Sequence, residues 1–152
     1  MAEAITNHLL GDRVQAVSAG SAPDQNKFRE TRGVHPRAIA MLKSAGIPTE
    51  SLVSKSWDPF IAQKDSIDFV FTLCGSALKD MAEACPVFPG TPRQAHWGLD
   101  DPSHVQGTEA EIQRAFKEAF EILNRRITLF GELIKRPLTE HAQQDIEAIG
   151  KK

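Results

Sequence analysis

The feature that most constrains the fold is an apolar, β-prone run at residues 67–73, which ends directly before Cys74. Such a run is typical of a strand that is buried on both faces in a parallel sheet. Open α/β sheets place ligands and reactive groups at the carboxyl ends of their strands. The run therefore predicts a central strand with Cys74 at a functional edge of the sheet.

The second of the two cysteines, Cys85, follows eleven residues later, after a helix-prone segment at residues 76–84. Pro86 and Pro89 then force irregular backbone. One thiol is thus expected on a rigid element and the other beside a segment that can move. This arrangement suits thiol–disulfide chemistry, in which one thiolate attacks and a second thiol resolves the product.

Non-catalytic roles stay open for the two cysteines. Cysteines in ordinary domains are often small buried hydrophobic residues. A structural disulfide is disfavoured because nothing in the sequence indicates secretion. A zinc site is disfavoured because the pair lacks close ligand spacing and His96 is the one histidine nearby. We therefore expect no metal site and no cofactor.

Length and charge limit the class of protein. A chain of 152 residues fits a single domain over residues 1–152 with a sizeable core. The net charge of −2 gives no electrostatic footprint for nucleic acid or an anionic membrane, and no apolar run approaches transmembrane length. The first residues do not have the pattern of a signal peptide. We expect a cytoplasmic protein, where a reactive thiol pair would be transient or catalytic.

Strand-like and helix-like segments alternate along the chain, which predicts a parallel α/β sandwich. The long helix is marked by a capping box, with Thr108 as the cap and Glu111 at the third helical position. The expected strands are residues 13–19, 67–73 and 93–97, and the expected helices are residues 1–10, 36–46, a short turn from 58, 76–84, 109–136 and 139–149.

The last segment, residues 137–150, is expected to be a helical extension of the domain. Its apolar residues Leu138, Ala142, Ile146 and Ile149 lie on one side of a short helix. This face could dock on the domain or contact a partner.

Seven short motifs, in a fixed order, carry a resemblance to a known family. The chain resembles the thioredoxin-coupled arsenate reductases, which are built on the low-molecular-weight protein tyrosine phosphatase fold. The resemblance covers nearly the whole chain and implies a three-layer α/β sandwich with a short parallel sheet. The motifs are Ser18-Ala19-Gly20-Ser21, Val34-His35-Pro36, Ser54-Lys55-Ser56, Thr72-Leu73-Cys74-Gly75, Ala84-Cys85-Pro86-Val87, His96-Trp97-Gly98 and Asp100-Asp101-Pro102.

The resemblance also implies an N-terminal phosphate-binding loop in which a cysteine is followed by five residues and an arginine. No such spacing occurs in these 152 residues. We expect a chain that starts within the first helix and lacks the first strand and the loop. A longer gene, a shortened product, or a homodimer that covers the missing strand would each account for this pattern.

The resemblance further implies roles for particular residues. In the family the loop cysteine attacks arsenic, the residue matching Cys74 attacks that thiol and releases arsenite, and the residue matching Cys85 then attacks Cys74. Thioredoxin, or a similar thiol reductant, reduces the resulting disulfide. Asp101 matches the general acid, and Ser18 and Trp97 are assigned to the pocket for arsenate or a phosphate-type oxyanion.

Two further functions are compatible with this sequence. One is a plain low-molecular-weight phosphatase, which needs the loop cysteine and the acid but not the Cys74–Cys85 pair. The other is a non-catalytic remnant or partner-binding domain that uses an exposed strand edge. Because the loop is not found, we expect these 152 residues neither to bind an oxyanion tightly nor to reduce arsenate.

Overall fold

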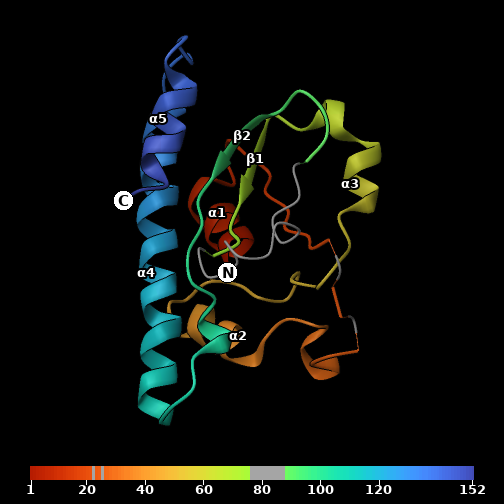
Figure 1. Cartoon of the computed structure of the whole chain (residues 1–152), viewed down its shortest axis with the longest axis vertical. Helices are drawn as coiled ribbons and strands as arrows, with labels where there is room; N and C mark the ends of the chain where they lie inside the picture. Colours follow the sequence, from red (N-terminus) through yellow and green to blue (C-terminus); the bar gives the residue numbers. More distant parts are fainter. Residues whose placement is uncertain (22, 25, 76–87) are drawn as a thin grey trace.

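A computed structural model describes residues 1–21, 23–24, 26–75 and 88–152. Helices α4 and α5 form one long side of the molecule, the two strands lie in the middle, and α3 lies on the opposite side (Figure 1). The elements are α1 (Ala2–Leu10), η1 (Arg29–Thr31), α2 (Pro36–Ser44), α3 (Asp58–Ala62), η2 (Lys64–Ser66), β1 (Phe69–Thr72), β2 (Arg93–His96), η4 (Pro102–His104), α4 (Glu109–Leu133) and α5 (Ala142–Ile149).

The two strands of the described sheet are parallel, as the sequence predicts. Phe69 pairs with Arg93 and the register continues to Thr72 opposite His96. The Trp97 N–H donates to the Thr72 carbonyl at 2.8 Å and extends the pairing by one step. All four residues of β1 are half-buried, so the prediction of a strand buried on both faces is too strong. Within the described residues the sheet has only these two strands, and its faces are only partly covered.

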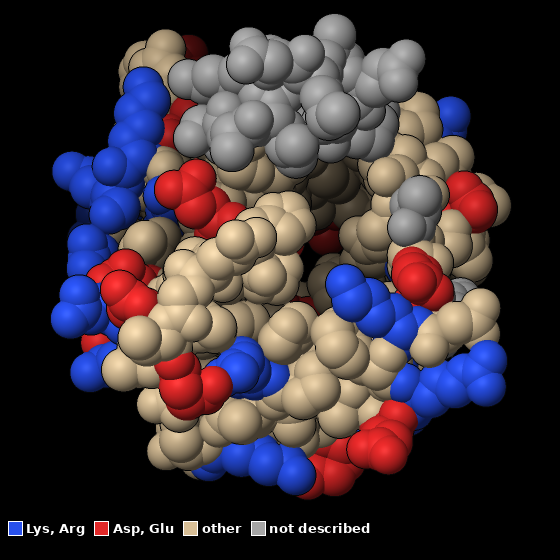
Figure 2. Space-filling view, turned by 60° about the horizontal axis from the view of Figure 1, so that its bottom comes forward, with Lys and Arg blue, Asp and Glu red and all other residues tan. Residues whose placement is uncertain are grey.

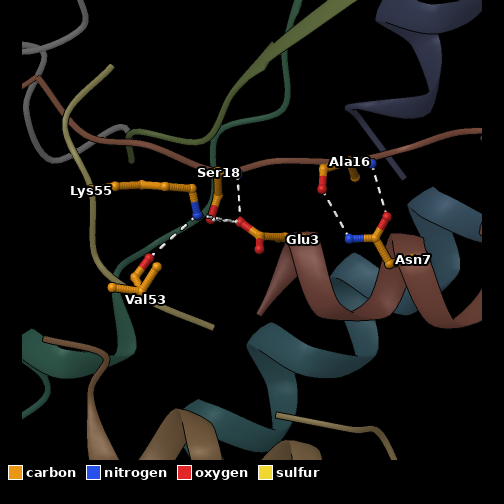
Figure 3. Close-up of polar contacts among 6 residues, drawn as sticks. All are labelled: Glu3, Asn7, Ala16, Ser18, Val53 and Lys55. Atoms are coloured by element: carbon orange, nitrogen blue, oxygen red, sulfur yellow. Dashed lines mark hydrogen bonds and ion pairs between the residues drawn. The ribbon is translucent and has the colours of Figure 1, made fainter. Parts of the chain in front are cut away.

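The prediction of a strand at residues 13–19 is wrong. The described chain has no strand there, and the nearest sheet-like pairing is a single bridge between Gly20 and Ser56. Side chains of α1 occupy the hydrogen-bonding edge of this segment instead. The Ala16 N–H donates to Asn7 Oδ1 at 2.8 Å, and Asn7 Nδ2 donates to the Ala16 carbonyl at 2.9 Å (Figure 3). The alternating pattern thus reflects extended backbone that pairs with a helix rather than with a strand.

The core lies between the sheet and the long helix. Phe71 packs on Trp97 with ring centroids 4.1 Å apart, and both rings contact Phe130 of α4 edge-on. Helix α1 crosses α4 closely at Gly131, where an added Cβ would lie 2.5 Å from Leu10 Cδ2. The other buried apolar residues of this cluster are Ala4, Ile5, Leu42, Ile47, Leu52, Ala95, Leu123, Ile127, Ile146 and Ile149.

The start of α4 follows the predicted capping box. The Glu111 N–H donates to Thr108 Oγ1, while Glu111 Oε2 accepts from the Thr108 N–H at 2.7 Å. The box satisfies backbone donors that the first helical turn would otherwise leave without partners. Both bonds also fix where the helix begins, directly after the loop that contains Asp101.

The C-terminal helix α5 docks against the domain. Ile146 is fully buried, its carbonyl accepts a 2.9 Å hydrogen bond from the Trp97 indole N–H, and Gln143 Nε2 donates to the Gln94 carbonyl of β2 at 2.7 Å. Helix α5 thereby packs along β2. Leu138 departs from the predicted apolar side, because it lies before the helix and is exposed.

Charged side chains of both signs are mixed on the surface. Figure 2 shows Lys and Arg interspersed with Asp and Glu on the face at the bottom of Figure 1. This mixing agrees with the net charge of −2. None of the helices in the described ranges combines the length and the apolar content needed to cross a membrane.

The docking of α5 gives a direct stability test. Changing Ile146 to Ala should lower the free energy of unfolding by roughly 2–5 kcal/mol, because a fully buried side chain would leave a cavity. Urea denaturation measures this difference. The matched control is Leu138→Ala in the exposed segment before the helix, which should stay within roughly 0.5 kcal/mol of the parent. Equal effects of the two changes would contradict the docking.

Candidate functional site

Cys74 lies where the sequence predicts it, directly beyond the carboxyl end of β1. The strand ends at Thr72, and Leu73, Cys74 and Gly75 continue from it. Cys85 and the helix predicted at residues 76–84 lie outside the described residues. The approach of the second cysteine to the first therefore stays a prediction.

The segment after β1 touches the segment after β2 through backbone atoms. A Cβ added at Gly75 would lie 2.8 Å from the Leu99 carbonyl oxygen, and one added at Gly98 would lie 2.7 Å from the Cys74 carbonyl oxygen. Real Cβ contacts essentially never reach such distances, so each glycine permits an approach that a side chain would block. The two strand exits consequently form one packed unit around Cys74.

This contact places Asp100, the residue before the predicted acid, against Gly75, the residue after the predicted redox cysteine. Asp100 Oδ1 would be 3.5 Å from a Cβ at Gly75, and Asp101 is the next residue. Asp101 caps η4 by accepting the Ser103 N–H at 2.8 Å, and its side chain is 55% exposed with His104 Nε2 at 4.0 Å. A capped but accessible carboxyl group can exchange a proton with a bound molecule.

A cavity of about 410 Å³ lies beside this loop. One wall is the segment after β2, and the other is the face of α4 that carries Arg126. Apolar and acidic groups share its lining, so Asp101 faces a concave surface rather than a flat one. The lining residues are Gly98, Leu99, Asp100, Asp101, Pro102, Val105, Ala115, Glu118, Ala119, Ile122 and Arg126.

Ser18 is hydrogen-bonded to a carboxylate of α1. Its N–H and its hydroxyl donate to Glu3 Oε2 at 2.6 and 2.7 Å, and Lys55 Nζ donates to the same oxygen at 2.9 Å (Figure 3). The Glu3 side chain is only 10% exposed. Burial alone would raise the pKa of Glu3, but the hydrogen bonds from Ser18 and Lys55 outweigh burial and hold the pKa below its ordinary value.

Sequence reasoning missed this cluster of Glu3, Ser18 and Lys55. Lys55 reads as part of an exposed connector, and it lies 52 residues from the carboxylate that it meets. The only signal in the sequence is the serine–lysine–serine motif at residues 54–56, which does not identify a partner. The role of Ser18 in an oxyanion pocket stays a prediction.

Trp97 lies in the core at the end of β2. The residue is 3% exposed, its indole N–H donates to the Ile146 carbonyl, and its ring packs on Phe71. The described contacts therefore give Trp97 a packing function. Its role as a pocket wall stays a prediction.

His35 is a further residue near the acid loop. It caps α2 by accepting the Arg37 N–H at its Nδ1 atom, and its ring lies between Phe28 and Phe116. Burial, followed by the positive charge of Arg37, lowers the pKa of His35, while the negative charge of Asp101 acts in the opposite direction. His35 is consequently neutral at pH 7, with its proton on Nε2.

The described residues include no group of three or more His, Cys, Asp or Glu side chains that could hold a metal ion. The chemistry that the described site offers is that of one cysteine sulfur, the two exposed carboxyl groups of Asp100 and Asp101, and backbone dipoles.

The buried carboxylate of Glu3 makes a testable contribution to stability. Changing Glu3 to Gln should lower the free energy of unfolding at pH 7 by roughly 1–3 kcal/mol, because a charged acceptor of three hydrogen bonds is lost. Since the folded-state pKa of Glu3 lies below its ordinary value of 4.5, this contribution exists above that pH and disappears as the pH falls below it.

Urea unfolding of the parent and of Glu3→Gln between pH 7 and pH 3 checks this pH dependence. The difference between the two proteins should shrink in acid. Exposed Glu30 provides the control, and Glu30→Gln should show no such trend. A constant difference between Glu3→Gln and the parent across the whole range would contradict the role of the cluster.

Comparison with known proteins places this chain in a family. The family model described as "Low molecular weight phosphotyrosine protein phosphatase" matches residues 1–140, so α5 lies beyond the matched part. Arsenate reductases of Halalkalibacterium halodurans and Bacillus licheniformis are each 35% identical over 132 residues, and that of Bacillus subtilis is 34% identical. Each alignment covers 87% of this chain and 85% of the relative.

These matches agree with the parallel pairing of β1 and β2. The chain belongs to the low-molecular-weight phosphotyrosine protein phosphatase family and is arsenate reductase-like.

Proposed function

We propose that this chain carries the thiol relay of a thioredoxin-coupled arsenate reductase, with Cys74 and Cys85 as the redox pair and Asp101 as the general acid. The observation that carries the proposal is the packed contact between Cys74–Gly75 and Gly98–Asp100. It holds a cysteine and an accessible carboxyl group on neighbouring strand exits. The relatives named arsenate reductase support the same chemistry.

The proposed relay balances two electrons. Arsenate is reduced to arsenite while two thiols become one disulfide. Cys74 attacks the sulfur that carries arsenic, forms a mixed disulfide with it and releases arsenite. Cys85 then attacks Cys74, which forms the Cys74–Cys85 disulfide and releases the first sulfur as a thiolate. Asp101 donates a proton to the leaving oxygen of the arsenate. The two thiols of thioredoxin return the two electrons and regenerate both cysteines.

The first thiol of the family reaction is not assigned to a residue here. These 152 residues contain no cysteine followed six positions later by arginine. A loop at a helix N-terminus with such a pair binds tetrahedral anions and lowers the pKa of its thiol. We therefore assign the transfer of electrons to Cys74 and Cys85, and we assign the capture of the oxyanion to none of these 152 residues.

Partners follow from this assignment. The partner is a cytoplasmic dithiol protein of the thioredoxin type, since a disulfide formed in a reducing compartment must be recycled. Within the described ranges β1 pairs only with β2. A second copy of the chain that covers the other edge of β1 is also part of the proposal.

A phosphatase is the second candidate, because the matching family model is described as a phosphotyrosine phosphatase. Such an enzyme would not use the Cys74–Cys85 pair. Hydrolysis of an aryl phosphate that persists after both cysteines are changed to Ser would favour this candidate over the relay.

The relay is tested by oxidation. Under a mild oxidant the mass of the reduced chain should fall by that of two hydrogen atoms, and both thiols should stop reacting with a thiol reagent. Thioredoxin with its reductase and NADPH should restore both thiols. Cys74→Ser and Cys85→Ser should each abolish the change, because each leaves a single cysteine. Mass spectrometry that shows two reduced thiols after oxidant treatment would overturn the proposal.

A further inference from the structure

Arg126 is buried on α4 and points at the loop that leads to the predicted acid. It is 7% exposed, and its Nη1 atom donates to the carbonyl oxygens of Trp97 at 2.8 Å and Gly98 at 3.4 Å. These two carbonyls end β2 and begin the segment that reaches Asp101. The arginine thus binds the strand exit from the side of the long helix.

The surroundings of Arg126 are unusual for a buried cation. None of the ion pairs in the described ranges involves it, and its Nε atom is buried without a hydrogen-bond partner among the described residues. Burial, followed by the charge of Arg125, lowers the pKa of Arg126. A well-packed apolar residue often replaces a buried charge without loss of stability, so packing alone does not require arginine here.

The loop that Arg126 binds has little freedom on its other side. Gly98 lies against the Cys74 carbonyl, and Gly75 lies against the Leu99 carbonyl and Asp100. The segment at residues 98–101 is therefore held between α4 and the backbone of Cys74–Gly75. Helix α4 also contacts η4, which follows the loop directly.

We propose that Arg126 is a positioning residue that holds the loop at residues 98–101, which carries Asp100 and Asp101, against the backbone of Cys74–Gly75. The guanidinium group is suited to this task, since one rigid planar group donates to two successive carbonyls. Arg126 itself touches neither Cys74 nor the reacting atoms in this scheme. This inference extends the proposed function, and the catalytic role that it gives to the loop rests on that proposal.

The experiment measures the position of the loop through the thiol. In a Cys85→Ser background Cys74 is the one cysteine left in the chain, and the pH midpoint of its alkylation by iodoacetamide reports nearby charge. Asp100→Asn should lower this midpoint by roughly half a unit or more, because a carboxylate packed against Gly75, the residue next to Cys74, opposes thiolate formation. In a protein that also carries Arg126→Met, the Asp100→Asn change should shift the midpoint by less than half of the shift measured with Arg126 present.

Two further variants separate positioning from general destabilisation. Arg126→Lys keeps a cation that can donate to a single carbonyl. It should therefore restore part of the midpoint shift that Asp100→Asn causes. Arg126→Lys also replaces Arg126→Met in the experiment if the Met variant does not fold. Arg125→Met is the matched control, since Arg125 is exposed and bonds only the Lys152 carbonyl among the described residues. Arg125→Met should leave the midpoint shift caused by Asp100→Asn unchanged.

An Asp100→Asn shift of equal size in the parent and in Arg126→Met would overturn the proposal, as would the absence of any shift in the parent. The measurement needs neither arsenate nor a disulfide. Failure of the thiol relay would appear instead as two reduced thiols after oxidation, so the two proposals fail separately.

Discussion

The contact on which the rest of the site depends is the close approach of two strand exits. Gly75 approaches the Leu99 carbonyl, and Gly98 approaches the Cys74 carbonyl, at distances that a side chain would block. The parallel register of β1 and β2 brings the two exits to the same edge of the sheet. The loop with Asp100 and Asp101 is consequently built onto the segment that carries Cys74.

Polar side chains of α1 also replace pairings that a larger sheet would provide. Asn7 and Glu3 of α1 bind the backbone of Ala16 and Ser18, and Lys55 closes the cluster. The carboxylate of Glu3 is largely buried but accepts three charge-assisted or backbone hydrogen bonds, which keeps it ionised. On the far side, α5 binds the end of β2 through Trp97.

Local signals in the sequence predicted the elements that depend on local physics. The capping box at Thr108, the β-prone run before Cys74 and the amphipathic tail each correspond to an element of the structure. Long-range pairings were not predictable in the same way. The segment at residues 13–19 alternates like a strand but binds helix side chains, and Arg126 gives no sign in the sequence that it reaches Trp97.

The contact between the strand exits is tested most directly by Gly98→Ala, measured through the rate of Cys74 alkylation in a Cys85→Ser background. The added methyl group would meet the His96 ring and would lie 2.7 Å from the Cys74 carbonyl oxygen, so the rate should change several-fold. Gly46→Ala is the control, because it strains a backbone with φ of +72° but meets nothing within 4 Å. A rate that is unchanged in Gly98→Ala, or changed equally in both variants, would contradict a site built on this contact.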